Sequence, residues 1–143
     1  MEPKPFLAPF YLIAATFIGL GDVLYLSYFH LLGLVPTCAI GGCEIVLTSP
    51  YSSPLGVPFA YIGVVYYVYM LGLGILLAYD PTSKGLRVGV LAYTAIGLVC
   101  SIGFELFQFF VIGALCLYCG ISAVTTLILF AVACWHYRST KIS

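Results

Sequence analysis

The stretch that decides the fold is residues 103–120, GFELFQFFVIGALCLYCG. It interrupts the apolar run 88–137, which is too long for a single membrane span of about 20 residues. Glu105 and Gln108 are the polar positions of the interruption, and Gly113 is a residue typical of a tight turn. The stretch therefore predicts two membrane helices joined by a short turn, at about 87–108 and about 115–137.

Composition indicates that the whole chain is a membrane protein. The 143 residues are 63% hydrophobic and only 7% charged, whereas soluble domains contain about 25% charged residues. Two further apolar segments, about 6–35 and about 59–79, are each long enough to span a bilayer. We expect the first to be a retained helix, because it is too long for a signal peptide. The prediction is one all-α membrane domain, residues 1–143, with four transmembrane helices and an outer loop at 36–58.

The basic residues predict how the chain is oriented in the bilayer. The N-terminus, the middle connection and the C-terminus contain all five of them, and four helices place these three regions on one side. By the positive-inside rule both termini are cytoplasmic, in an inner or plasma membrane, and the loop 36–58 faces outward. The net charge of zero, without a basic patch, gives no reason to expect a nucleic-acid partner. The five residues are Lys4, Lys84, Arg87, Arg138 and Lys141.

Two pairs of cysteines lie on the predicted outer face. Cys38 and Cys43 flank a glycine-containing loop segment, and Cys116 and Cys119 open the last predicted helix. Exposed amides at a helix start favour a thiolate, and two neighbouring dithiols can pass electrons by thiol–disulfide exchange. Three other interpretations are open: thiols that fill packing gaps, a structural loop disulfide, or a zinc site built from four cysteines.

Several other residues carry weaker expectations. Asp22 lies near the middle of the first predicted helix, where a carboxyl group either relays protons or stays neutral and hydrogen-bonded between helices. Cys100 and Cys134 lie along the helices, and we expect neither to take part in exchange. Five glycines are expected to allow close helix contacts. They are Gly19, Gly21, Gly72, Gly74 and Gly97.

Three motifs occur in a characteristic order along these predicted helices. They are CEIVLTSP at 43–50, LGVP at 55–58 and CLYC at 116–119. In this combination the chain resembles the vitamin K epoxide reductase family in its prokaryotic form, over nearly its whole length. The resemblance implies a four-helix bundle around a quinone, with a short amphipathic loop segment covering the quinone pocket.

The resemblance also implies a role for individual residues. Cys119 matches the family's cysteine nearest the quinone ring, and Cys116 matches its exchange partner. Cys43 matches the loop cysteine that bonds to Cys116, and Cys38 matches the outer cysteine that meets a thioredoxin-like protein. Ser49 matches the family's loop serine, which is linked to the active cysteines and the quinone site.

The implied activity is that of a quinone-dependent thiol oxidoreductase that supports disulfide-bond formation. Electrons would pass from a separate thioredoxin-like protein through the two cysteine pairs to ubiquinone, menaquinone or a related quinone. Two positions depart from the vertebrate relatives: Phe59 replaces an asparagine that hydrogen-bonds the quinone, and Ala123 replaces a tyrosine. We therefore expect an aromatic quinone contact at Phe59, with another group acting as hydrogen-bond donor. The alternative is a non-enzymatic membrane helix bundle with a structural loop disulfide.

Overall fold

The computed structural model describes residues 5–38 and 42–142, and the regular elements within these ranges are all helical. Lys4, which contributed to the predicted orientation, and Gly41, in the segment between Cys38 and Cys43, lie outside the described residues. Four helices are long and apolar enough to cross a membrane, so the predicted four-helix transmembrane fold is confirmed. The helices are α1 (Ala8–Leu31), the short α2 (Cys43–Thr48), α3 (Phe59–Tyr79), α4 (Lys84–Phe107) and α5 (Leu117–Ile142).

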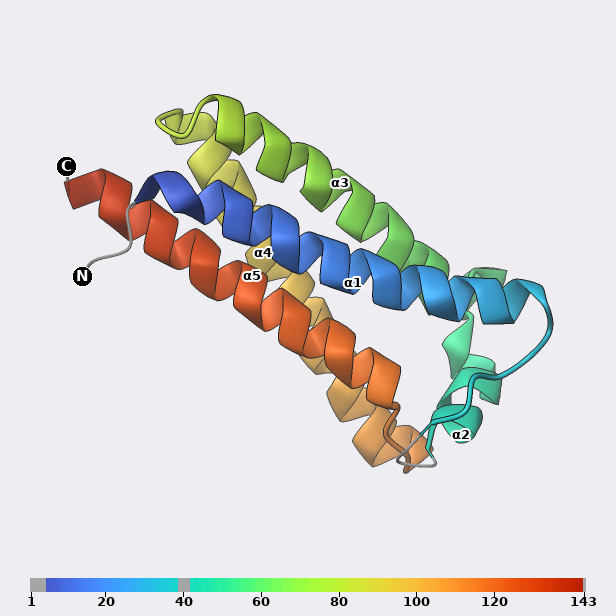
Figure 1. Ribbon diagram of the computed structural model, residues 1–143. Coiled ribbons are helices and arrows are strands. Elements are labelled where there is room, and N and C mark those ends of the chain that lie inside the picture. The colour runs from blue at the N-terminus through green and yellow to red at the C-terminus, as the bar shows by residue number, and fades with distance from the viewer. Residues whose placement is uncertain (1–4, 39–41, 143) are drawn as a thin grey trace.

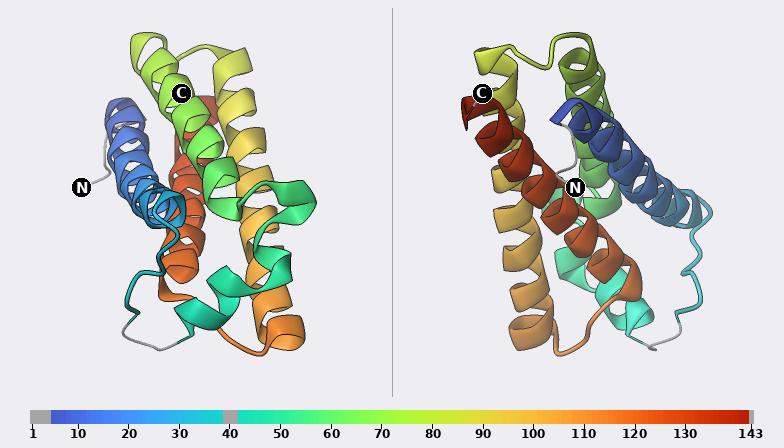
Figure 2. Two further views of the ribbon diagram at one scale, coloured as in Figure 1. Left: turned by 90° about the vertical axis from the view of Figure 1, so that its right-hand side faces the viewer. Right: turned by 60° about the vertical axis from the view of Figure 1, so that its left-hand side comes forward.

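The four long helices form an antiparallel bundle in which α1 packs against α3 and α5, and α4 packs against the same two helices. The described N- and C-terminal ends lie together at one end of this bundle (Figure 1). At the opposite end, α2 and the following turns at Pro50–Ser52 and Pro54–Gly56 lie across the helices (Figure 2). The loop cysteines are therefore far from both termini.

Local backbone chemistry explains why two helix ends differ from the predicted limits. α1 ends earlier than predicted because Gly33 adopts a positive φ of 67° and Pro36 follows, a combination that does not continue a helix. α4 begins earlier than predicted, directly after Ser83. The Ser83 hydroxyl accepts a hydrogen bond of 3.5 Å from the backbone N–H of Leu86, which caps the first turn.

The predicted turn near Gly113 connects α4 to α5. A π-helical turn at Gln108–Ile112 extends α4, and Gly113 then takes a left-handed φ of 77°. The backbone carbonyl of Gln108 accepts hydrogen bonds from the N–H groups of Gly113 at 2.8 Å and Ala114 at 3.3 Å. These bonds close the helix end, so the chain reverses direction and enters α5 at Leu117.

The outward faces of the long helices are apolar, whereas the buried serine and threonine hydroxyl groups donate hydrogen bonds within their own helix. Val65 and Val99, for example, are each 70% exposed. The buried Thr16 hydroxyl donates a 2.7 Å hydrogen bond to the Leu12 carbonyl one turn earlier. A bundle in lipid needs both properties, because the bilayer core offers no water to pair with polar groups.

Glycine allows the helices to approach closely at some of the predicted positions. A Cβ atom at Gly19 would lie 2.3 Å from the ring of Tyr67, so α1 and α3 are in tight contact there. The prediction was wrong for Gly21 and Gly72, where an added Cβ would meet nothing within 4 Å. The other two glycines, Gly74 and Gly97, also face side chains of neighbouring helices at short range.

Candidate functional site

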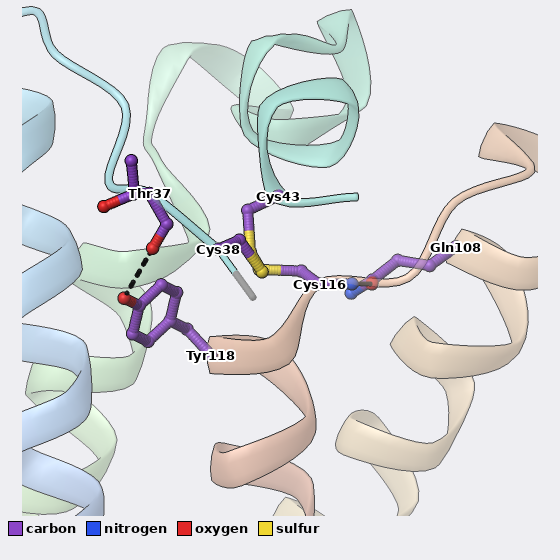
Figure 3. Close-up of a disulfide and its surroundings, with 6 residues drawn as sticks. All are labelled: Thr37, Cys38, Cys43, Gln108, Cys116 and Tyr118. Atoms are coloured by element: carbon purple, nitrogen blue, oxygen red, sulfur yellow. Dashed lines mark hydrogen bonds between the residues drawn. A yellow bond between two sulfur atoms is a disulfide. The ribbon is translucent and has the colours of Figure 1, made fainter. Parts of the chain in front are cut away.

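Three cysteines meet at the end of the bundle that carries α2 and the loop before it (Figure 3). Cys38 and Cys43 form a disulfide, and the Cys116 sulfur lies 3.3 Å from the Cys43 sulfur. Cys43 is completely buried and Cys116 is only 2% exposed. A free thiol is thus held in contact with a disulfide sulfur, and thiol–disulfide exchange requires this access.

Contacts on both sides of the loop disulfide hold it against the start of α5. Before the disulfide, the Tyr118 hydroxyl donates a 3.1 Å hydrogen bond to the Thr37 carbonyl. Within the loop, Gly42 lies so close to the chain that an added Cβ would be 2.1 Å from the Leu115 carbonyl oxygen. Only glycine permits this approach, which brings the loop to the residue immediately before Cys116.

The first turn of α5 stabilises the thiolate form of Cys116. Hydrogen bonding by the Cys119 side chain is the largest effect on its pKa, and backbone hydrogen bonds from Cys119 and Tyr118 act in the same direction. Burial opposes them, but together they lower the pKa of Cys116 from 9.0 to about 7. Since the thiolate is the attacking species in exchange, a large fraction of Cys116 is reactive at neutral pH.

Gln108 connects the end of α4 to this thiol. Its side chain is completely buried, and its Oε1 atom accepts a 3.1 Å hydrogen bond from the backbone N–H of Cys116 (Figure 3). Sequence analysis assigned Gln108 only to the turn, because no sequence pattern predicts a hydrogen bond between two helix ends. The Gln108 side chain therefore orients the backbone of Cys116, and with it the Cys116 thiol.

A cavity of about 380 Å³ lies in the half of the bundle that carries the loop and α2, with walls from α1, α3, α4 and α5. Residues of the loop and α2 also line it, and the lining is mainly apolar. Cys119 lines this cavity, whereas Cys116 does not. Phe59 also lines it and packs on Phe104 with ring centroids 4.2 Å apart. The size and lining are those of a small-molecule site.

Comparison with known families agrees with this arrangement. A sequence model of the vitamin K epoxide reductase family matches residues 10–134, which is most of the chain. The chain belongs to the vitamin K epoxide reductase family. No curated protein matches the sequence. Family membership and the four apolar helices together identify an integral membrane oxidoreductase, and the resemblance drawn from the three sequence motifs is confirmed.

The remaining residues considered in the sequence occupy different parts of this family member. Ser49 ends α2, where its hydroxyl donates a 2.9 Å hydrogen bond to the Val46 carbonyl, and it lies outside the cavity lining. Ser52, three residues later, is the loop serine that lines the cavity. Cys100 also lines it, although sequence analysis excluded this cysteine from the site. Cys134 lies on α5 toward the end that carries the termini.

The described residues include no cluster of three or more His, Cys, Asp or Glu side chains placed to hold a metal ion. Two of the four cysteines of the zinc interpretation are joined in the Cys38–Cys43 disulfide. A disulfide sulfur is not the thiolate that zinc binds. The geometry of this state therefore corresponds to thiol exchange.

Proposed function

We propose that the chain is a quinone-dependent thiol oxidoreductase that supports disulfide-bond formation. One observation carries the proposal: Cys116 contacts the loop disulfide at 3.3 Å, while Cys119 lines the apolar cavity. The two cysteines are three residues apart at the start of one helix, so a disulfide between them would connect the loop to the cavity. Electrons can then travel from loop to cavity by exchange alone.

The residues of the chain act in a defined order in this proposal. A quinone bound in the cavity supplies an acceptor for two electrons and two protons. Cys119 and Cys116 give up two electrons as they form a disulfide with each other. The Cys43 thiolate then attacks Cys116 and releases Cys119, and Cys38 attacks Cys43 and releases Cys116.

A separate thioredoxin-like dithiol completes the cycle by reducing Cys38–Cys43 and leaving as a disulfide. The sum is one dithiol and one quinone converted into one disulfide and one quinol, so electrons and protons balance. The pairing in the structure, with a Cys38–Cys43 disulfide and free Cys116 and Cys119, corresponds to the state that awaits this partner. The partner therefore needs access to the loop and not to the cavity.

The test uses purified protein in lipid nanodiscs, a purified thioredoxin-like donor, and short-chain ubiquinone and menaquinone analogues. Quinol formation is followed by absorbance. We expect Cys119→Ser to abolish quinone reduction and the matched variant Cys134→Ser to retain it. Normal quinone reduction by Cys119→Ser would refute the assignment.

A second measurement separates the proposal from a non-enzymatic bundle. In a background lacking Cys38 and Cys119, mild oxidation should trap a Cys43–Cys116 disulfide that mass spectrometry detects after alkylation. If this disulfide never forms, and the wild-type Cys38–Cys43 bond never exchanges with a donor, the loop disulfide is structural.

We also propose that both termini are cytoplasmic and that the loop cysteines face outward. In support, the four described basic residues all lie at the end of the bundle opposite the loop. A membrane-impermeant maleimide should label Leu55→Cys in intact cells but label Tyr79→Cys only after lysis, in a background without other reactive thiols. Both parent residues are strongly exposed, one at each end of the bundle. The reverse labelling pattern would invert the orientation.

A further inference from the structure

Three buried polar atoms on the cavity wall have no hydrogen-bond partner among the described residues. They are Oδ2 of Asp22 on α1, the hydroxyl of Tyr66 on α3 and Oε1 of Glu105 on α4. Buried polar atoms in folded proteins are nearly always paired with protein, water or ligand, so these three atoms are available to a polar ligand or water in the cavity. Cys119 on α5 lines the same cavity, so all four long helices contribute a polar group.

The two carboxyl groups are expected to be neutral acids. Both lie within membrane-spanning helices, and His30 is the basic residue in the described lining of the cavity. Asp22 Oδ2 and Glu105 Oε1 are buried without a hydrogen-bond partner among the described residues, and an unpaired carboxyl group in a mainly apolar cavity favours the protonated form. Each carboxyl group can therefore donate a hydrogen bond into the cavity and release a proton there.

Glu105 lies near both cysteines of the pair at the start of α5. It lines the cavity together with Cys119, and it also borders a separate, more open groove together with Cys116. Asp22 faces the same cavity from α1. Both acids thus line the cavity that Cys119 lines, and Glu105 also borders the groove that Cys116 borders.

We propose that Asp22 and Glu105 supply the two protons that a quinone takes up when Cys116 and Cys119 reduce it. This inference rests on the proposed function. The two thiols lose their protons and two electrons as their S–S bond forms. Each carboxyl group gives its proton to one quinone oxygen and recovers a proton from a thiol, so one dithiol and one quinone give one disulfide and one quinol.

The residue at position 59 supports a carboxyl group as the donor to the quinone oxygen. Phe59 lines the cavity at the position where the family resemblance places an amide donor, and a phenyl ring cannot donate to a carbonyl oxygen. A reacting thiol also needs a base nearby to take its proton, and a quinone oxygen needs an acid. A carboxyl group performs both tasks in sequence, which an amide cannot do.

The test compares Asp22→Asn and Glu105→Gln with the wild type and with Asp80→Asn, a control at an exposed carboxyl group outside the cavity. Pre-reduced protein in nanodiscs is mixed with a short-chain benzoquinone, and single-turnover quinol formation is measured in H₂O and D₂O. We expect each amide variant to be about 10²-fold slower, the scale of one general acid, with a larger solvent isotope effect. The quinone KM should change much less, because the amide still donates a hydrogen bond.

Two further measurements exclude a merely structural role. Oxidation of the Cys116–Cys119 pair by diamide, which needs no quinone, should proceed at the wild-type rate in both amide variants. Asp22→Glu and Glu105→Asp keep an acid and should recover most of the turnover. Wild-type turnover in either amide variant, or equal losses in the amide and acid-retaining variants, would overturn the inference. Absence of quinone reduction in the wild type would instead refute the proposed function.

Discussion

Substitution of Gly42 by alanine tests whether the loop must touch the start of α5. The new Cβ would lie 2.1 Å from the carbonyl oxygen of Leu115, whereas Cβ atoms in proteins essentially never come within 3.0 Å of another heavy atom. The two backbones must therefore separate by about 0.9 Å. Gly42 precedes Cys43 and Leu115 precedes Cys116, so the displacement falls directly on the pair of sulfurs now 3.3 Å apart.

The expected result is a large kinetic effect with a moderate loss of stability. A misplacement of about 1 Å can slow a reaction about 10²-fold, and overpacking costs about 1–3 kcal/mol of unfolding free energy. The assay follows formation of the Cys43–Cys116 disulfide under mild oxidation, in a background where Cys38 and Cys119 are serine. Gly72→Ala is the matched control, because its added Cβ meets nothing within 4 Å. If the loop variant formed the disulfide as fast as the control, close packing of the loop would not govern exchange.

Two other predictions follow from the described contacts. Cys119→Ala removes the side-chain hydrogen bond that contributes most to the lowered pKa of Cys116, so this pKa should rise above about 7 and the thiolate fraction at pH 7 should fall. The pH profile of Cys116 alkylation by iodoacetamide measures the midpoint, and an unchanged midpoint would contradict the assigned cause. Gly19→Ala places a Cβ 2.3 Å from the Tyr67 ring and should lower the unfolding free energy by about 1–3 kcal/mol, whereas Gly21→Ala, in open surroundings, should not. Denaturant titration in detergent compares the two variants, and equal stability would argue against tight packing of α1 on α3.

The helices and their order could be predicted because membrane spans follow length and hydropathy. The turn at Gly113 could also be predicted, since polar residues and a glycine interrupt one long apolar run. The helix ends were harder to predict, because Ser83 and Gly33 act through capping and backbone geometry, which hydropathy does not report. Local chemistry at the ends, rather than apolar content, decides where a membrane helix begins.

Some residues of the candidate site could not be predicted, because their contacts do not follow from any local sequence pattern. The position of Cys100 in the middle of a predicted helix led us to exclude it from the site, yet on α4 it lines the same cavity as Cys119. Gln108 was interpreted as a turn residue, but it binds the backbone of Cys116 eight positions later. Both depend on how α4 packs against α5, and only the assembled bundle shows this packing.

The separation of Cys116 from Cys119 by one helical turn has a consequence for how the two substrates are kept apart. The loop disulfide contacts Cys116, whereas Cys119 lines the cavity. In the proposed cycle this arrangement keeps a soluble dithiol from reducing the quinone directly, so the short helical segment separates the two electron-transfer steps as well as connecting them. In the proposed cycle the protein partner meets Cys38 and the lipid-soluble acceptor meets Cys119, so the two substrates are distinguished at different cysteines although loop residues also line the cavity.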